Sequence, residues 1–321
     1  MECLLVKLLE PLNVPDEMIE ELAKPIKESG HEFVYFNEKT TDSAELIERS
    51  EGADVVMIAN NPYPTDIIDQ TESLKLINVA FTGVDHVGIA DAKNQDILVA
   101  NAAGYANQAV AELVIGLTLD VYRRISQGDK DIRQENYPGA FQGSEIKGKT
   151  VGIVGTGKIG LETAALFKAF GTKLIGTNRS ESPEGEALGI EYMELDELLT
   201  QADIVSLHVP LTPDTKNMIS KEKLALMKDS AILINCARGP IVDNAALTDA
   251  LNEGEIAGAG IDVFDMEPPI PADYPLLQAK NAVLTPHVGF LTNEAMKMRA
   301  EIAFENTMAF LNDEPQNIIK R

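Results

Sequence analysis

The chain has 321 residues, of which 45% are hydrophobic, and its 27 basic and 51 acidic side chains give a formal net charge of −24. This excess of negative charge argues against nucleic acid or an anionic membrane as a partner, because both would be repelled. The length is sufficient for two domains, each with a hydrophobic core of its own.

The two cysteines, Cys3 and Cys236, suit a reducing compartment and argue against a disulfide framework. The apolar start of the chain is short, is interrupted by Lys7 and ends at Pro11, which is typical of a first strand rather than of a signal peptide. No apolar run approaches the length that spans a membrane. We therefore expect a cytoplasmic protein without a membrane segment.

The first hundred residues alternate between strand and helix patterns. Helices are expected at 15–28, 43–50 and 65–70, with Pro25 disturbing the last turn of the first. Strands are expected at 3–9, 31–36, 54–59, 74–81 and 97–100. Strands that alternate with helices indicate a parallel sheet, so this region is predicted to form a small α/β unit.

The longest helix is expected at 106–125, where apolar side chains follow one stripe, and it is a candidate connection between two domains. The polar residues 126–148 are typical of a long loop. Six more strands are expected at 151–154, 173–177, 203–208, 231–235, 257–261 and 282–285. Six strands with helices between them are typical of a doubly wound dinucleotide fold. We expect a last helix, at about 293–312, to return to the first domain.

A glycine-rich turn follows the first strand of that second group. Gly155, Gly157 and Gly160 lie between an apolar strand and a helix, which is the context that a dinucleotide-binding turn requires. The first glycine allows a tight turn, the second lets a pyrophosphate approach, and the third lets strand and helix pack closely. The helix N-terminus, with Lys158 and Ile159, then presents free N–H groups to the phosphates. The turn predicts dinucleotide binding.

Polar side chains follow three later strands of the same half. Arg238 comes after the strand at 231–235, Asp262 ends the next strand, and His287 follows the last, with Glu267 five residues beyond Asp262. Each residue also has an ordinary structural interpretation: Arg238 as part of a surface ion pair, Glu267 as a solvated loop residue and His287 as a turn residue. Ligands of open α/β sheets bind at the carboxyl ends of the strands, however, and all of these residues fall there. A cation, a carboxylate and an imidazole near a nicotinamide suit hydride chemistry on a carbonyl acid.

Five motifs carry a family resemblance: GTGKIG at 155–160, HVPLTPDTKNMI at 208–219, INCARGPIVD at 234–243, GIDVFDMEP at 260–268 and TPHVG at 285–289. With these motifs the sequence resembles the D-isomer-specific 2-hydroxyacid dehydrogenase family over essentially its whole length. The resemblance implies a Rossmann cofactor domain at 102–287 and a smaller, discontinuous flavodoxin-like substrate domain at 1–101 and 288–321. It also implies an active site in the cleft between them, and a homodimer formed through the cofactor domain.

The resemblance also implies the roles of the polar residues. His287 would give a proton to the substrate carbonyl as hydride arrives, which is worth roughly 10²–10⁴-fold in rate. Glu267 would pair with the second ring nitrogen, orienting the ring and favouring its charged form. Arg238 would hold the carboxylate of a 2-oxo acid and polarise its carbonyl. Asp262 would accept a hydrogen bond from the nicotinamide carboxamide. No residue is assigned to a metal.

Other residues are expected to line the site. The backbone N–H groups of Gly83 and Val84 would complete the carboxylate clamp, and Asn61 and Thr82 would also contact substrate. The further cofactor contacts are expected at Thr82, Val209, Cys236, Ala237 and Gly289. We expect His208 to line the cofactor or pack, and Cys236 to line the nicotinamide pocket rather than act as a nucleophile. The loop at 60–63 should line the variable end of the substrate site. It contains no Arg or Lys, which disfavours a phosphorylated substrate.

The form of the cofactor depends on the end of the second strand, where an acid would bind the ribose of NAD. This chain has Asn178, Arg179 and Ser180 there, with Glu181 as a later acid directed to solvent. Without the acid there is no repulsion of a 2′-phosphate, and Arg179 and Ser180 are able to bind one. We therefore favour NADP, with NAD as the alternative.

The sequence thus predicts an NAD(P)-dependent oxidoreductase that acts on the CH–OH group of D-2-hydroxy acids and works as a 2-oxo acid reductase if NADP(H) is used. Glyoxylate, hydroxypyruvate, pyruvate and longer 2-oxo acids are candidate substrates, and 3-phosphoglycerate stays open. A cofactor-sensing corepressor is the alternative of another class, but the chain has no disordered tails or basic segments for partners. Formate dehydrogenase is rejected, because its pattern has Gln where this chain has Glu267.

Overall fold

A computed structural model of the protein describes residues 2–136, 139, 141–266 and 269–319. The chain forms two compact units, one of residues 1–106 with 291–321 and the other of residues 107–290. The sequence placed the two boundaries after 101 and after 287. The later second boundary leaves the whole TPHVG segment, residues 285–289, within the larger unit.

The smaller unit has a five-stranded sheet in the order β2-β1-β3-β4-β5, in which every pair is parallel. Its strands are β1 (Leu5–Leu8), β2 (Glu32–Tyr35), β3 (Val55–Ile58), β4 (Leu76–Val79) and β5 (Leu98–Asn101). Its helices are α1 (Asp16–Glu28), α2 (Ser43–Ser50), α3 (Thr65–Ile68), α4 (Ile89–Asn94) and α12 (Asn293–Leu311). This strand order is that of the flavodoxin-like fold.

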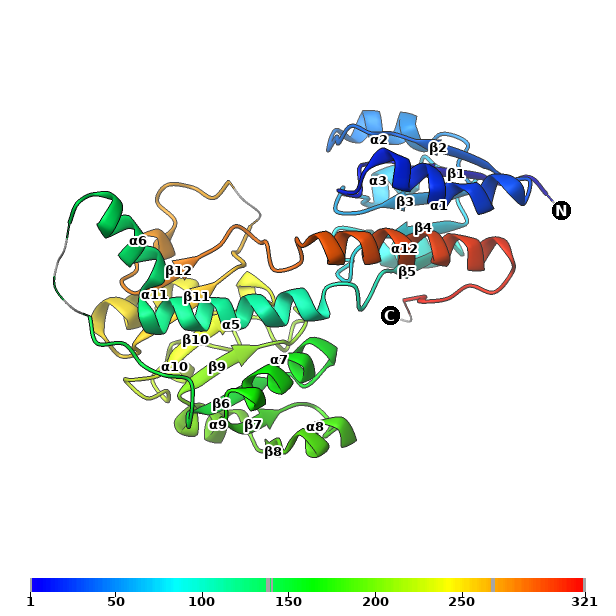
Figure 1. Ribbon diagram of the computed structural model, residues 1–321. Helices are drawn as coiled ribbons and strands as arrows, with labels where there is room; N and C mark the ends of the chain where they lie inside the picture. The colour runs from blue at the N-terminus through cyan, green and yellow to red at the C-terminus, as the bar shows by residue number, and fades with distance from the viewer. Residues whose placement is uncertain (1, 137–138, 140, 267–268, 320–321) are drawn as a thin grey trace. The chain divides into compact units, whose positions relative to one another are not determined.

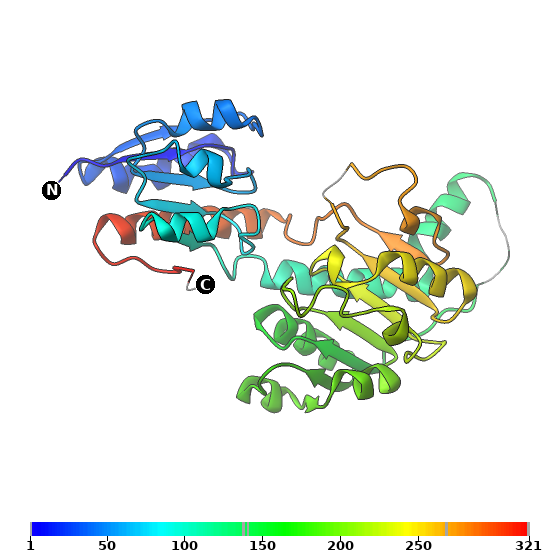
Figure 2. The same cartoon turned by 180° about the vertical axis from the view of Figure 1, so that it is seen from behind.

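The sheet of the smaller unit is buried on both faces, as the continuous apolar runs of its strands require. In β3, Val55 and Met57 belong to the core that α1 and α12 share, whereas Val56 and Ile58 belong to the core under α2, α3 and α4. Figures 1 and 2 show these helices on the two sides of the sheet. α1 runs through Pro25 to Glu28, because a proline this close to the end of a helix removes only one bond of its last turns.

The last helix of the chain, α12, is also the longest among the described residues, with 19 residues against the 17 of α5 (Asn107–Arg123). The expectation that the longest helix lies at 106–125 is therefore wrong. The Asn78 side chain of β4 donates to the carbonyl of Ala303 in α12 at 2.6 Å, so the helix is fixed to an inner strand of the sheet.

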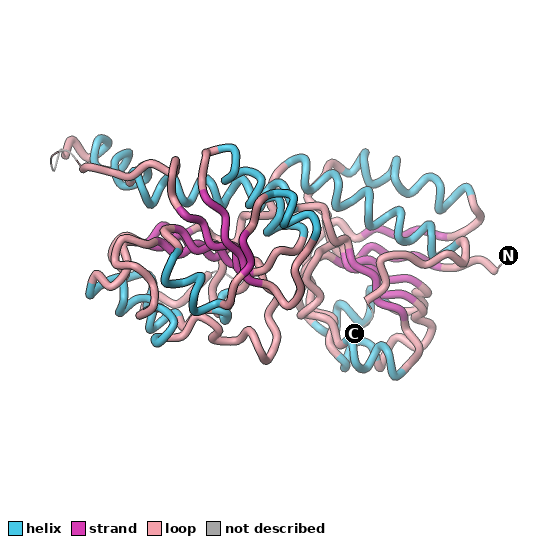
Figure 3. Tube along the Cα trace, turned by 90° about the horizontal axis from the view of Figure 1, so that it is seen from below, coloured by secondary structure: helices cyan, strands magenta, loops and turns pink. Residues whose placement is uncertain are grey.

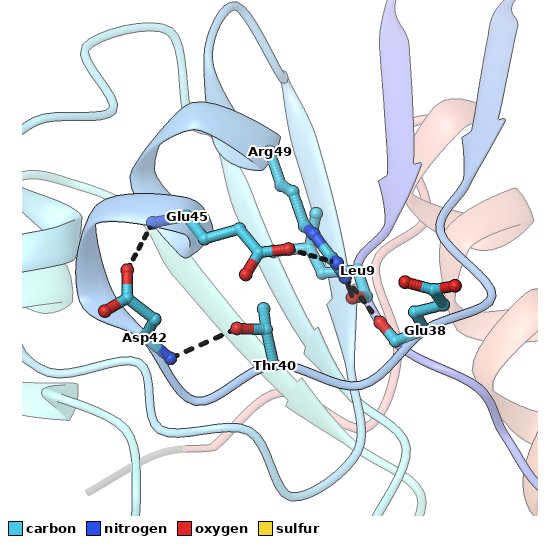
Figure 4. Close-up of polar contacts among 6 residues, drawn as sticks. All are labelled: Leu9, Glu38, Thr40, Asp42, Glu45 and Arg49. Carbon is cyan, nitrogen blue, oxygen red and sulfur yellow. Dashed lines mark hydrogen bonds and ion pairs between the residues drawn. The ribbon is translucent and has the colours of Figure 1, made fainter.

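The loops that leave β1 and β2 are joined by Arg49 of α2 (Figure 4). Its guanidinium donates to the carbonyls of Leu9 at 2.9 Å and Glu38 at 2.6 Å, and it pairs with Glu45. Asp42 caps the same helix by accepting from the backbone N–H of Glu45. The carboxyl edge of this sheet is thus held by a buried cation that the sequence analysis did not single out.

The larger unit has a seven-stranded parallel sheet in the order β12-β11-β10-β9-β6-β7-β8. Its strands are β6 (Thr150–Val154), β7 (Lys173–Thr177), β8 (Glu191–Tyr192), β9 (Ile204–Leu207), β10 (Ile232–Asn235), β11 (Gly258–Ile261) and β12 (Ala282–Leu284). The order reverses between β6 and β9, as in a Rossmann fold. The sequence predicted six strands and missed β8, because two residues show no alternation.

Helices cover both faces of this sheet, and Figure 3 shows the strands of each unit, in magenta, enclosed between helices in cyan. Besides α5 they are α6 (Ile125–Arg133), α7 (Lys158–Ala169), α8 (Pro183–Leu188), α9 (Leu195–Gln201), α10 (Lys221–Leu224) and α11 (Asn244–Glu253), with short 3₁₀ turns η1 (Gly239–Ile241) and η2 (Pro275–Gln278). α5 and α7 share one core with the sheet, and α9, α10 and α11 share the other. Across the described ranges, no helix is both long and apolar enough to cross a membrane.

The segment after α5 is a second helix rather than the start of the long loop that the sequence predicted. Arg124 adopts a left-handed φ of 50°, which ends α5, and α6 begins at the next residue. Asp120 accepts from the backbone N–H of Ser126, and an ion pair joins Asp129 to Arg133 within α6. These polar contacts stabilise α6, and only Ile125 and Ile132 among its nine residues are large and apolar, so the segment resembled a polar loop in the sequence.

Candidate active site

The three glycines of the turn after β6 differ in what the protein itself requires of them. Gly155 has a φ of +95°, and a Cβ on Gly160 would lie 2.0 Å from the carbonyl oxygen of Gly155. Gly157 has an ordinary φ of −75°, and a Cβ there would meet nothing within 4 Å. The fold therefore needs the first and third glycines, whereas the second keeps a space open beside the N-terminus of α7.

That space suits the pyrophosphate of a dinucleotide. Gly157 is the N-cap of α7 and provides no side-chain cap, so the first N–H groups of the helix, at Lys158, Ile159 and Gly160, have no intrahelical acceptor. Free N–H groups and the positive end of the helix dipole bind phosphate. Val209 packs against the turn, since a Cβ on Gly155 would lie 2.9 Å from its Cγ1. The residues of this turn thus fit the pyrophosphate of a dinucleotide cofactor.

The end of β7 lies beside this turn, because the backbone N–H of Gly155 donates to the carbonyl of Thr177 at 2.9 Å. The next three residues, Asn178, Arg179 and Ser180, are exposed. The Asn178 amide donates to the Ser180 carbonyl at 2.8 Å, which closes a small turn around Arg179. No carboxylate stands among these residues, and Arg179 offers a cation.

The Arg238 segment is held by a side chain that the sequence analysis missed. Asn235 ends β10 with a fully buried side chain, whose oxygen accepts from the Ala237 N–H at 3.0 Å and whose nitrogen donates to the Arg238 carbonyl at 2.9 Å. Arg238 is half-buried, and its Nη1 donates to the carbonyl of Ala237 at 2.8 Å. An asparagine at the end of an apolar strand was the signal available in the sequence.

The Asp262 carboxylate, only 1% exposed at the end of β11, holds the segment that carries His287. One oxygen accepts from the Thr285 hydroxyl at 2.6 Å and from the Val288 N–H at 2.9 Å, and the other accepts from the Gly289 N–H at 2.8 Å. The sequence analysis assigned Asp262 to the nicotinamide carboxamide instead. The second oxygen retains a lone pair for such a donor, because a carboxylate accepts about four hydrogen bonds.

His287 itself has a left-handed φ of 56°, which is uncommon for a residue other than glycine. Its backbone N–H donates to the carbonyl of Asp262 at 2.9 Å, so Asp262 contacts this turn through main chain and side chain alike. The half-buried imidazole stands edge-on to Phe290, with ring centroids 5.3 Å apart and planes at 86°. A strained backbone held by several contacts is typical of functional sites.

Glu267 lies outside the described residues, but the segment before it is anchored. Asp265 accepts from the Asn244 amide at 2.9 Å and from the Tyr274 hydroxyl at 2.8 Å. A Cβ on Gly239 would lie 1.9 Å from the carbonyl oxygen of Phe264, so this segment packs directly on the residue after Arg238. The sequence analysis did not single out Asp265, because an acid in a polar loop gives no signal of its partners.

Two half-buried side chains near these loops are kept neutral. Burial raises the pKa of the Cys236 thiol well above its usual value, which removes the thiolate that a nucleophile needs. Burial also lowers the pKa of His208 to about 3, and its Nε2 lies 2.8 Å from the Ser206 hydroxyl. Both side chains are uncharged at neutral pH, as suits groups that line or pack.

The residues expected to bind substrate in the smaller unit follow β3 and β4. The side chain of Asn61 is fully buried, and its backbone N–H donates to Glu10 at 2.7 Å, as does that of Ala59. The Glu10 carboxyl is 1% exposed, and burial raises its pKa. Glu10, which the sequence analysis did not name, therefore sets the backbone of this loop.

The loop after β4 carries three more of these residues. Thr82 is exposed and Gly83 is half-buried, whereas Val84 is buried. The carbonyl of Thr82 accepts from the Asn101 amide at 2.8 Å, which ties the loop to the end of β5. All three residues thus stand at the carboxyl edge of the smaller sheet.

One sequence-based argument about substrate needs correction. The loop at 60–63 contains no lysine of its own, but the Lys39 ammonium donates to the Asn60 side chain at 2.8 Å. Lys39 lies in the segment after β2, which the buried Arg49 holds in place. A cation from another segment therefore stands at this loop, so the lack of Arg and Lys within residues 60–63 no longer argues against a phosphorylated substrate.

The larger unit places its polar residues on neighbouring strands. Arg238, Asp262 and His287 follow β10, β11 and β12, which pair in that order at one end of the sheet, and the glycine turn follows β6 at the same carboxyl edge. Of the residues that the structure describes, no group of three His, Cys, Asp or Glu side chains is arranged to hold a metal ion. The arrangement combines a dinucleotide turn with a cation and an imidazole.

Comparison with known proteins gives consistent matches. Residues 115–289 match the family model described as D-isomer specific 2-hydroxyacid dehydrogenase, NAD binding domain. The chain is 34% identical to a hydroxypyruvate reductase of Blautia hydrogenotrophica, covering 93% of this chain and 94% of that one, and 40% identical to a glyoxylate reductase of Thermococcus litoralis, covering 86% of each. It also resembles the structure of an acyclic imino acid reductase (Bsp5) in complex with NADPH and D-Arg, with a TM-score of 0.87, 31% identity and coverage of 98% and 99%.

Proposed function

The chain belongs to the D-isomer specific 2-hydroxyacid dehydrogenase family, and from that premise we propose that it reduces a small 2-oxo acid to the D-2-hydroxy acid with a nicotinamide cofactor. The observation that carries this proposal is the turn at 285–289. The buried carboxylate of Asp262 holds the turn in which His287 has a left-handed conformation. His287, Asp262 and Arg238 follow the three neighbouring strands β12, β11 and β10.

The bound cofactor supplies the hydride, and the side chains supply charge and a proton. Arg238 binds the carboxylate of the substrate through charge-assisted hydrogen bonds and polarises the carbonyl. His287 donates its ring proton to the carbonyl oxygen and takes it back in the reverse direction. Glu267, which lies outside the described residues, is proposed as the partner of the other ring nitrogen.

The cofactor we propose is NADP, with NAD as the alternative. Arg179 and Ser180 stand exposed directly after β7, and no carboxylate among residues 177–180 would repel a 2′-phosphate. Kinetics with both cofactors test this proposal. Arg179→Ala should raise the KM for NADPH and leave the KM for NADH unchanged, and an unaltered NADPH affinity would contradict it.

The substrate class follows from the groups around the loop at 60–63. Names of similar proteins suggest glyoxylate, hydroxypyruvate and their reduction products. Because the ammonium of Lys39 lies at Asn60, larger substrates with a second anionic group are also candidates, including the 2-oxo acid formed from 3-phosphoglycerate. A panel of 2-oxo acids assayed with NADPH and NADH decides among them. Tight cofactor binding without any substrate-dependent oxidation of either cofactor would favour a sensor instead.

We also propose a homodimer formed through the larger unit, and α6 supports it (Figure 1). No residue of this helix is buried, and Ile125 and Ile132, which share a face seven residues apart, are 56% and 68% exposed. Exposed apolar side chains on one face are typical of an interaction site. Ile132→Asp should shift the mass measured by light scattering from dimer to monomer.

A further inference from the structure

The hydroxyl of Tyr192 joins two chain segments that are far apart in the sequence. Tyr192 is the last residue of the short strand β8 and pairs with Gly176 of β7. The hydroxyl donates to Thr156 Oγ1 in the glycine turn at 3.0 Å. It also accepts from the backbone N–H of Ser182 at 3.4 Å and lies 3.4 Å from the Ser182 hydroxyl. One side-chain oxygen thus connects the turn after β6 with the loop after β7.

The structure makes room for this hydroxyl. A Cβ on Gly185, in the first turn of α8, would lie 2.1 Å from the Tyr192 oxygen. The N–H of Gly185 donates instead to the Ser182 hydroxyl at 2.9 Å, so α8 begins against the same group. At the other end, Thr156 is 3% exposed. Both partners of Tyr192 are thereby held in fixed positions.

The two connected segments are those to which the proposed function assigns the adenosine end of the cofactor. The glycine turn would hold the pyrophosphate, and the residues 178–180 would hold the 2′-phosphate. The loop at 178–182 is exposed except at Ser182, and the Asn178–Ser180 bond braces only its first half. Tyr192 holds the second half, beyond Arg179.

Resting on that proposed function, we propose that Tyr192 is a specificity-determining positioning residue. Its hydroxyl fixes the loop at 178–182 relative to the glycine turn, so that Arg179 and Ser180 face a phosphate bound to the 2′-oxygen of adenosine. Tyr192 itself does not touch the reacting atoms. Its loss weakens ligands that carry the 2′-phosphate and spares those that lack it, because only the former depend on the position of this loop.

Calorimetry with the purified full chain tests the proposal without a turnover assay. Tyr192→Phe removes the hydroxyl and keeps the ring, and it should weaken binding of NADPH and of 2′-AMP by about 3- to 10-fold, the effect of one net hydrogen bond. NADH and 5′-AMP should change by less than about 2-fold. Thr156→Val removes the acceptor and should reproduce this pattern, whereas Thr156→Ser keeps the hydroxyl and should restore wild-type affinities.

The matched control is Tyr122→Phe, which removes a tyrosine hydroxyl bonded to the Asp203 carbonyl at 3.4 Å, away from the glycine turn. It should leave the ratio of NADPH to NADH affinity unchanged. The double variant of Tyr192→Phe and Thr156→Val should lose no more than Tyr192→Phe alone, since Tyr192→Phe already removes the bond that Thr156→Val breaks. Additive losses, or equal losses for NADPH and NADH, would overturn the role of Tyr192.

The wild-type protein separates the two proposals. If it binds 2′-AMP more tightly than 5′-AMP and Tyr192→Phe keeps that ratio, the NADP proposal stands and the Tyr192 inference is wrong. If the wild type shows no preference for 2′-AMP, the proposed NADP selectivity fails, and the inference that depends on it is overturned as well.

Discussion

The turn at 155–160 and the turn at 285–289 both follow a parallel strand of the larger unit, but different interactions stabilise their conformations. The first depends on missing side chains, because Gly155 has a positive φ and Gly160 leaves no space for a Cβ. The second contains a histidine with a positive φ and is held by a carboxylate from a neighbouring strand. Glycine spacing is visible in a sequence, whereas the partners of Asp262 are visible only in the structure.

Replacing His287 by Asn should have the largest effect. Asn tolerates a left-handed φ better than most residues, so the backbone of the turn should survive. The reduction rate kcat should fall by roughly 10²- to 10⁴-fold, the usual worth of a positioned acid or base. Steady-state kinetics and a thermal melt are the measurements. A variant that folds normally and keeps its rate would remove His287 from the chemistry.

Two glycine variants distinguish the packing role of Gly160 from the cofactor-binding role of Gly157 in the turn at 155–160. Gly160→Ala should destabilise the protein by roughly 2–4 kcal/mol, because its Cβ would lie 2.0 Å from the Gly155 carbonyl oxygen. Gly157→Ala should leave the unfolding free energy within about 0.5 kcal/mol of wild type and weaken cofactor binding. Chemical unfolding and cofactor titration measure the two effects. Equal destabilisation by both variants would show that Gly157 serves packing too.

Asp262→Asn tests the hydrogen bonds by which the Asp262 carboxylate holds the turn at 285–289. An amide replaces one acceptor oxygen by a donor facing an N–H, which should cost about 1–3 kcal/mol of stability. Hydrogen exchange at Val288 and Gly289 should accelerate, while the glycine turn keeps its protection. Asp265→Asn is the matched control, because its contacts with Asn244 and Tyr274 lie on another segment. Faster exchange at 288–289 in the control as well would contradict the specific role of Asp262.

The effect that is smallest at neutral pH concerns His208, whose backbone packs against Gly155. An unfolded histidine has a pKa of about 6.5, and burial lowers the pKa of His208 to about 3. Between these values only the unfolded state binds the proton, so stability falls as pH drops below 6.5, by up to about 1.4 kcal/mol per pH unit. His208→Gln should flatten the dependence of the unfolding free energy on pH between 5 and 6.5. Parallel curves for both proteins would exclude this contribution.

Much of the fold could be predicted because it depends on local patterns. Apolar runs between helical segments indicated two parallel sheets, since strands buried on both faces need no polar alternation. The glycine turn was recognisable from spacing, and Arg238, Asp262 and His287 were found because each lies within three residues of the end of a strand. The short β8 was missed because two residues show no alternation, and α6 was missed because only two of its nine residues are large and apolar.

What the sequence by itself determined is therefore the parallel α/β architecture, the dinucleotide turn, the family and the polar residues at strand ends. Only the tertiary structure decided that Asp262 holds the His287 turn, that Asn235 holds the Arg238 segment and that Lys39 reaches Asn60. The physical reason is that a hydrogen bond between a side chain and a distant loop leaves no periodicity in either segment. Such contacts form only when the sheet brings the ends of its strands to one edge.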